Sequence, residues 1–161
     1  MEKIRGDIMS DIEQLLFIFH ELIENIQRMN QSEYDTWETD LKPAEIHLVD
    51  CIYKNAGSNL SAISDVFGIT KGGVSKMLKR LQVKNTIVSF KKPGNNKELY
   101  FELTEKGKEI YKKHQEIHEK WKNRDSKILA KLNYKEIHQL LCSIQKLNQY
   151  VRDEIEEMRI E

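Results

Sequence analysis

The chain has 161 residues, of which 39% are hydrophobic and 32% are charged, a composition typical of one globular domain with additional helices. Its 26 basic and 26 acidic side chains give a formal net charge of zero, which excludes a uniformly basic or acidic protein. The charges are unevenly placed, because residues 68–97 hold eight Lys or Arg and no Asp or Glu. A basic segment in an otherwise acidic chain is typical of a nucleic-acid binding surface.

Cysteine usage and hydropathy bear on the compartment. Cys51 and Cys142 are far apart and belong to no Cys-x-x-Cys pair, so we interpret both as small core residues in a reducing environment. The first 11 residues contain no apolar run of the kind a signal peptide needs. No stretch approaches the roughly 20 apolar residues of a membrane span. We therefore expect a cytoplasmic protein without a membrane partner.

The N-terminal segment predicts a helix with more apolar surface than one contact can bury. Ser10 followed by Glu13 has the pattern of a capping box, which predicts a helix from there to about Asn30. Its apolar residues cover more than one stripe, so we expect it to contact a second copy of the chain as well as its own core. Residues 30–40 are polar and predict a loop.

A helix-turn-helix pattern follows. Pro43, which is tolerated in a first helical turn, opens a helix that ends near Asn55. Residues 60–67 predict a short helix, and a turn at residues 67–69 leads into the next one. The side chains of the short helix predicted to point inward are Leu60, Ile63, Val66 and Phe67.

The second helix of this motif, Thr70–Leu81, has the properties of a recognition helix. Gly68 suits a turn position with positive φ, and Thr70 is a good N-cap. Val74, Leu78 and Leu81 recur at helical spacing, which leaves a basic opposite face for the DNA major groove. Thr70 and the first free amides can hold a phosphate. The predicted DNA contacts on this helix are Thr70, Lys71, Gly72, Gly73, Ser75, Lys76 and Lys79.

A basic hairpin is predicted directly after the recognition helix. Residues 87–90 and 99–103 are rich in β-forming side chains, and residues 93–96 between them are a strong turn signal. A two-stranded hairpin here completes a winged helix. The wing residues predicted to contact the DNA backbone or minor groove are Lys91, Lys92 and Lys97.

Two long helices complete the chain. The first is predicted from Thr104 to about Leu132, and Asn133 with Glu136 forms a capping box for the second. The last helix carries a seam of apolar residues seven apart, which favours an intermolecular helix interface. The fold class is therefore mainly α (α+β), with a winged helix-turn-helix domain at residues 41–107. Residues 1–40 and 108–161 are predicted to form a helical dimerisation region.

This order of elements resembles the MarR family of winged helix-turn-helix transcriptional regulators. The resemblance is carried by residues 59–64, 70–76 and 103–107. It implies a homodimeric repressor that binds palindromic operator DNA, with each recognition helix in a major groove, each wing in a minor groove, and an affinity controlled by an effector. Where the family has an Asp-x-Arg wing signature, this chain has Asn95, Asn96 and Lys97. Lysine lacks the planar fork of arginine, so we expect weaker or less shape-selective wing binding.

Three histidines resemble a further feature of that family. His114 and His118 are four apart on one predicted helix and can point the same way, a spacing that can chelate a metal. With His47 they resemble both the zinc-responsive uptake repressors and the repressor of fatty-acid synthesis. In the zinc case an acidic fourth ligand is implied, but an ungapped count reaches Met29 here; the nearby acids are Glu24, Glu33 and Asp35. Three interpretations stay open: a regulatory metal such as zinc, an acyl-type or other apolar effector, or structural hydrogen-bonding histidines.

Two other classes of function compete with the DNA-binding regulator. A zinc-dependent enzyme built on the three histidines is disfavoured, because the sequence has no His-Glu-x-x-His, no phosphate-binding glycine loop and no Gly-x-Ser-x-Gly. A winged helix used only as a protein-interaction module fits the altered wing tip but not the acid-free basic segment. We therefore expect a regulator and not an enzyme.

Overall fold

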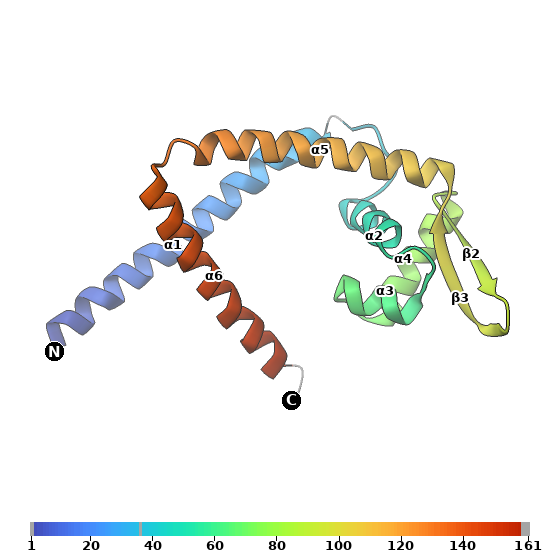
Figure 1. Ribbon diagram of the computed structural model, residues 1–161, viewed down its shortest axis with the longest axis horizontal. Coiled ribbons are helices and arrows are strands. Elements are labelled where there is room, and N and C mark those ends of the chain that lie inside the picture. The colour runs from blue at the N-terminus through green and yellow to red at the C-terminus, as the bar shows by residue number, and fades with distance from the viewer. Residues whose placement is uncertain (1, 36, 159–161) are drawn as a thin grey trace. The chain divides into compact units, whose positions relative to one another are not determined.

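The computed structural model describes residues 2–35 and 37–158, and the side chains of residues 9–31, 37–95 and 97–158. Two compact units, Met1–Ile117 and His118–Glu161, are each described by themselves. The fold is mainly α with a small antiparallel sheet, which confirms the predicted class. The elements in chain order (Figure 1) are α1 Glu2–Asp35, α2 Pro43–Lys54, β1 Ser58–Asn59, α3 Leu60–Phe67, α4 Lys71–Val83, β2 Ile87–Lys92, β3 Asn95–Leu103, α5 Glu105–Leu129 and α6 Tyr134–Glu157.

The N-terminal helix is longer than its sequence signals predicted. Helix α1 begins at Glu2, so Ser10 lies inside it and the predicted capping box does not start it. At the other end the helix continues to Asp35, through the first half of the predicted loop. The physical reason is that the chain contains no proline before Pro43, and polar side chains alone do not end a helix.

The boundaries of the helix-turn-helix agree with the prediction because each has a local signal. The side chain of Asn59 caps α3 by accepting the backbone N–H of Ala62 at 2.9 Å. Gly68 ends α3 with φ of 73°, a conformation that glycine adopts without strain. One inward assignment was wrong: Val66 is 61% exposed, because it lies on the outer side of this short helix.

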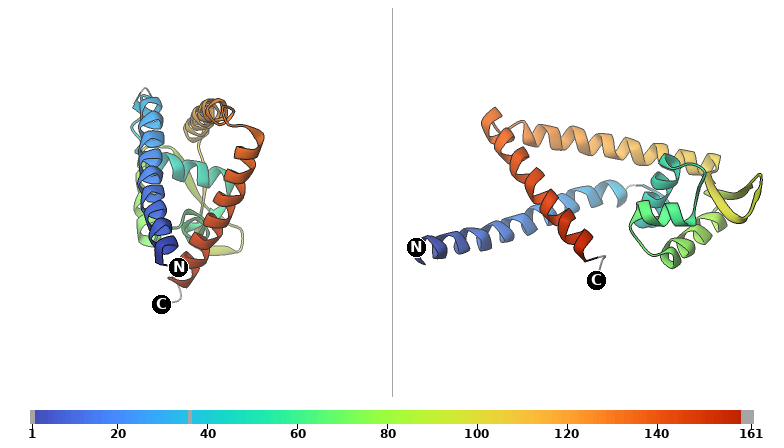
Figure 2. Two further views of the ribbon diagram at one scale, coloured as in Figure 1. Left: turned by 90° about the vertical axis from the view of Figure 1, so that its left-hand side faces the viewer. Right: turned by 60° about the horizontal axis from the view of Figure 1, so that its bottom comes forward.

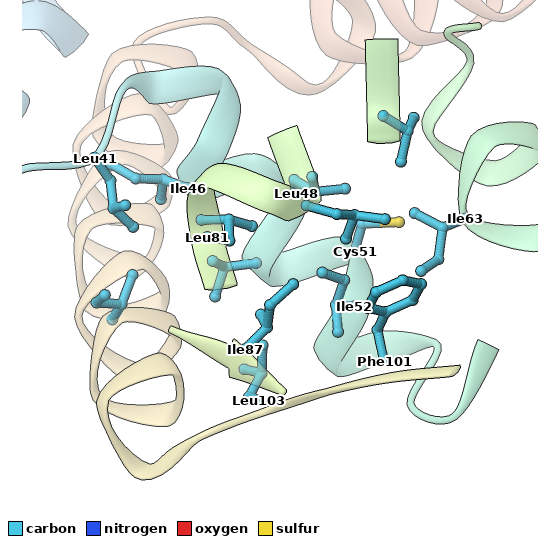
Figure 3. Close-up of a cluster of buried hydrophobic side chains, with 14 residues drawn as sticks. Leu41, Ile46, Leu48, Cys51, Ile52, Ile63, Leu81, Ile87, Phe101 and Leu103 are labelled. Atoms are coloured by element: carbon cyan, nitrogen blue, oxygen red, sulfur yellow. The ribbon is translucent and has the colours of Figure 1, made fainter. Parts of the chain in front are cut away.

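The core of the first unit lies beneath the helix-turn-helix. Val74, Leu78 and Leu81 of α4 are buried and pack with apolar side chains of α2, α3 and the sheet (Figure 3). Thr70 caps α4, its hydroxyl accepting the N–H of Gly73 at 3.3 Å. The buried core residues are Leu41, Ile46, Leu48, Val49, Cys51, Ile52, Ile63, Val74, Leu78, Leu81, Ile87, Phe101, Leu103 and Ile110.

The wing belongs to a sheet of three strands, not two. Strand β1 pairs antiparallel with β3, where Asn59 lies opposite Tyr100, and the strand order is β1-β3-β2. No pattern in the sequence predicted β1, because it is two residues long and ends at a helix cap. The hairpin loop is also shorter than predicted. Lys92 already pairs with Asn95, and Gly94 between them has φ of 81°.

The wing leads into α5 through a tight contact between backbones. The N–H of Thr104 donates to the carbonyl oxygen of Thr86 at 3.1 Å, and its hydroxyl donates between the carbonyl oxygens of Asn85 and Thr86, at 2.8 and 3.0 Å. The same hydroxyl accepts the N–H of Gly107 at 3.1 Å. Gly107 therefore lies directly against the Thr86 carbonyl, where a Cβ atom has no room.

The long helices expose much apolar surface in the single chain. Asn133 and Glu136 form the predicted capping box of α6. Cys51 is buried, as predicted, but Cys142 on α6 is exposed, so it was wrong to place it in a core. Among the described residues, no helix is both long and apolar enough to span a bilayer. The exposed large apolar side chains on α1 are Met9, Ile12, Leu15, Leu16, Phe17, Ile18, Phe19, Leu22, Ile23, Ile26 and Met29, and those on α6 include Leu140, Leu141, Ile144, Leu147, Val151 and Ile155.

Candidate nucleic-acid interface

The outer face of α4 is basic and open. Lys71, Lys76 and Lys79 are exposed and Ser75 is half-buried, opposite the apolar side that packs on the core. A Cβ atom added at Gly72 would meet no atom within 4 Å, so the first turn of the helix is accessible to a partner. This turn also has free backbone N–H groups, which favour an anion such as a phosphate.

Two of the eight basic residues in the acid-free segment form ion pairs with a carboxylate of the same domain. Arg80 Nη1 lies 3.5 Å from Glu45 Oε1 and Lys84 Nζ lies 2.9 Å from Glu45 Oε2. Both come from the C-terminal end of the α4 region, and Glu45 lies in the first turn of α2. The six lysines that remain are the six predicted to contact DNA, and all of them are exposed.

Glu45 is the buried anion that holds this end of α4. Its side chain is buried, and it also accepts the backbone N–H of Lys42 at 3.0 Å. Burial alone would raise the pKa of Glu45. The hydrogen bond from Lys42 and the charges of Lys84 and Arg80 outweigh it, so the pKa lies below its usual value. Glu45 is therefore ionised at neutral pH and fixes α4 to α2.

The wing presents the three predicted lysines. Lys91, Lys92 and Lys97 are exposed around the β2–β3 hairpin, which the right-hand view of Figure 2 shows extending away from the helices of its domain. Lys92 Nζ lies 4.1 Å from the centre of the Tyr100 ring, a cation–π contact. Asn95 accepts the backbone N–H of Lys97 at 3.1 Å through its side-chain oxygen, so the tip is ordered by its own side chains.

Between the recognition helix and the wing lies a groove that sequence reasoning missed. Its volume is about 360 Å³, and both walls carry residues predicted to contact DNA. It also contains Glu98, which no motif singled out, and Asn59, which belongs to the resemblance segment 59–64 but was not predicted as a site residue. The two residues are 39 positions apart and meet only in the fold. The groove is lined by Asn59, Leu60, Ser61, Ser75, Leu78, Lys79, Gln82, Lys97, Glu98, Leu99 and Phe101.

Two of the three histidines lie together. The rings of His47 and His114 are 5.3 Å apart, and His114 Nδ1 lies 3.9 Å from a carboxylate oxygen of Asp50. His114 is buried, whereas His118 is exposed and lies against Trp121. In the described part of the chain, no three His, Cys, Asp or Glu side chains are grouped as metal ligands. The side chains of Glu33 and Asp35, two of the acids considered as a fourth ligand, lie outside the described residues.

Replacing Thr70 with alanine is expected to lower the free energy of unfolding by about 0.5–1 kcal/mol, because the first turn of α4 loses its cap. The effect is at the low end because this bond is exposed and 3.3 Å long. Urea unfolding followed by circular dichroism at one protein concentration measures it. Thr70→Ser keeps the hydroxyl and should retain most of the stability; equal losses in both variants would contradict the cap.

These features define a winged helix-turn-helix protein with a basic recognition helix and a basic wing. Residues 41–99 match the model of the MarR family. The match covers the winged helix-turn-helix domain and not the long helices outside it.

Several known proteins are similar to this chain in sequence or in fold. The uncharacterized HTH-type transcriptional regulator YvnA of Bacillus subtilis (strain 168) is 33% identical over 94 residues, which cover 58% of this chain and 60% of that protein. FabT of Streptococcus pneumoniae, known from a crystal structure in complex with DNA, is 22% identical in sequence to this chain. The structures match with a TM-score of 0.76 over 88% of this chain and 97% of that chain. The zinc-responsive MarR family member ZitR of Lactococcus lactis is 19% identical, with a TM-score of 0.65, covering 83% and 99%.

The matches to curated relatives cover only part of each protein. At these identities the two structures establish the fold of the chain. The chain spans 60% of the length of YvnA and 53% of that of the regulator PchR, also from Bacillus subtilis. The family and the relatives are regulators and not enzymes, in agreement with the expectation from the sequence.

Proposed function

We propose that the chain is a homodimeric transcriptional regulator, and specifically a repressor, that binds palindromic operator DNA. The observation that carries the proposal is the distribution of charge on the winged helix. Six exposed lysines lie on α4 and the wing, while the two other cations of the segment are paired with Glu45. The lysines would meet phosphates and base edges, and Thr70 with the amides of residues 71–73 would hold a phosphate. FabT, which shares the fold, has been crystallised in complex with DNA.

The exposed apolar faces of α1 and α6 support a dimer. Contiguous apolar surface of this extent is rare on a soluble monomer, and the seven-residue repeat of α6 suits a helix interface. A dimer would present two copies of α4, which must lie about 34 Å apart to enter successive major grooves. Sedimentation equilibrium tests this directly; a monomer at micromolar concentration would contradict the proposal.

Binding to the DNA upstream of its own gene is the experiment that tests the function. We expect a shift in fluorescence anisotropy that random DNA of equal length reproduces only at much higher protein concentration. The logarithm of the affinity should fall linearly with the logarithm of salt concentration, since lysine–phosphate contacts release counterions. Binding to neither DNA at about 50 mM salt, where such contacts are strong, would favour the alternative, a winged helix that contacts only proteins.

Replacing Lys76 with alanine is expected to weaken operator binding by about 1–3 kcal/mol if the lysine reads a guanine. The loss would then be confined to operator DNA. An equal loss on operator and random DNA would make Lys76 a phosphate contact. Lys112, exposed on α5 outside the winged helix, supplies the matched control: Lys112→Ala should leave both affinities unchanged.

The effector is a separate part of the proposal. We propose that its binding changes the DNA affinity, and the three interpretations of the histidines predict different results. Zinc titration by calorimetry, repeated with operator DNA present, tests the metal interpretation. Heat together with a change in DNA affinity supports a regulatory metal held by His47, His114 and His118. If zinc produces neither heat nor a change in DNA affinity, the metal interpretation is removed. An apolar effector or structural histidines then remain.

A further inference from the structure

A carboxylate lies among the lysines of the candidate DNA surface. Glu98 follows Lys97 in β3 and lines the groove between α4 and the wing. One of its oxygens accepts the side-chain amide of Asn59 at 2.9 Å. The other accepts the side-chain amide of Asn95 and the hydroxyl of Tyr100, each at 2.9 Å. A negative charge at this place repels DNA phosphates. A carboxylate here therefore weakens DNA binding unless it supports binding in another way.

Asn59 connects this carboxylate to the helix-turn-helix. Its side-chain oxygen caps α3 through the N–H of Ala62 at 2.9 Å, while its amide nitrogen donates to Glu98. Asn59 also lies in β1, opposite Tyr100 of β3. The side chain of Asn59 therefore joins the start of α3 to strand β3 of the wing. Both donor–acceptor distances lie in the usual range for hydrogen bonds.

The wing side of the network extends to the tip of the hairpin. Asn95 donates to Glu98 and accepts the backbone N–H groups of Lys97 and Glu98 at 3.1 and 3.3 Å. Tyr100 donates to Glu98 and lies beneath Lys92. Hydrogen bonds from Tyr100, Asn59 and Asn95, with the nearby charge of Lys92, hold the pKa of Glu98 below its usual value. Its ionised form, which can accept all three bonds, is the form present at neutral pH.

We propose that Glu98 and Asn59 are positioning residues that fix the direction of the wing relative to the recognition helix and thereby set the preference for operator over random DNA. The inference rests on the proposed DNA-binding function. Glu98 opposes DNA binding through its charge and supports it through geometry. Replacing Glu98 therefore separates the two effects, because loss of its charge raises the affinity for DNA whereas loss of its positioning role lowers the preference for operator DNA.

The experiment compares Glu98→Gln with Glu102→Gln in the full-length protein. Both remove one negative charge from β3, but Glu102, exposed four residues further on, is outside the network. A charge effect alone tightens binding of both variants to operator and random DNA alike. Positioning predicts that only Glu98→Gln loses preference: random DNA binds more tightly while the operator-to-random affinity ratio falls about tenfold.

Exchanging the donor at position 59 with the acceptor at position 98 is expected to restore the operator-to-random affinity ratio. Asn59→Asp keeps the cap of α3 but places a carboxylate against Glu98, so it should also lower the affinity ratio. In the double variant Asn59→Asp with Glu98→Gln, the glutamine amide can donate to the new aspartate, and the net charge equals that of the wild type. Recovery of most of the ratio is expected; a double variant no better than the worse single variant would overturn the proposal.

A readout without DNA keeps the two proposals distinguishable. The amides of Lys97 and Glu98 are held by Asn95, so hydrogen exchange at these positions should accelerate in Glu98→Gln and stay unchanged in Glu102→Gln. If the wild-type protein shows no operator preference, the proposed function fails whatever the wing does. If the preference exists and Glu98→Gln leaves both the affinity ratio and the exchange rates unchanged, the positioning role fails alone.

Discussion

Replacing Gly107 with alanine is expected to lower the free energy of unfolding by about 3 kcal/mol, the upper end of the range for overpacking. The new Cβ would meet the carbonyl oxygen of Thr86 at a distance that real Cβ atoms essentially never show, and would crowd Leu103 as well. The obstacle is backbone, so no side-chain rotation relieves it. The Thr86 carbonyl also accepts two bonds from Thr104, so moving it disturbs the junction of the wing with α5.

Gly72→Ala is the matched control for that variant. Both glycines lie in the first turn of a helix, but a Cβ atom at Gly72 meets nothing within 4 Å. Alanine there should stabilise α4 by about 0.5–1 kcal/mol through its higher helix propensity. Urea unfolding of the two variants at the same protein concentration compares them. A Gly107→Ala protein as stable as Gly72→Ala would contradict the backbone contact.

Replacing Glu45 with alanine is expected to cost about 3 kcal/mol, the low end of the range for breaking a buried ion pair. The variant removes the hydrogen-bond acceptor of Lys84 and of the N–H of Lys42, and the ion-pair partner of Arg80. Lys84 and Arg80 are partly exposed and can be rehydrated, which limits the loss. Glu109→Ala, at an exposed position of α5, serves as the control in the same unfolding experiment and should change stability by less than about 0.5 kcal/mol.

The same carboxylate predicts how stability depends on pH. The pKa of Glu45 is lower in the folded protein than its usual 4.5, so the unfolded chain binds a proton more readily. Its contribution is therefore fully present above pH 4.5 and is lost as the pH falls through the lower, folded-state pKa. Urea unfolding from about pH 6 to about pH 3 should show a smaller acid loss in Glu45→Gln than in the wild type; equal slopes would contradict the assignment.

The sequence predicted the parts of the fold that have local signals. Gly68, Thr70 and the spacing of Val74, Leu78 and Leu81 are close together in the chain, so the turn and the recognition helix could be placed within one or two residues. The predicted DNA-contacting lysines were identified by the same local pattern. The structure finds all of them exposed, while their contacts with DNA stay predictions.

What the sequence could not predict depends on long-range pairing. Strand β1 exists only because β3 lies beside it. Arg80 and Lys84 belong to the same acid-free basic segment as the predicted DNA contacts, and only the structure shows that both form ion pairs with Glu45. The ends of α1 were predicted wrongly for the opposite reason. A local capping pattern is present, but the helix continues through it because no proline interrupts this segment.

Attachment of α4 at its C-terminal end has a consequence for protein engineering. Glu45 pairs with the C-terminal end of the helix, and Val74, Leu78 and Leu81 hold its inner side in the core. We therefore expect the outward-facing side chains from Lys71 to Lys76 to carry little of the folding free energy. Libraries that randomise Lys71, Gly72, Ser75 and Lys76 should therefore yield mostly folded proteins. Under the proposed DNA-binding function, new DNA sequence preferences can be selected there without first stabilising the scaffold.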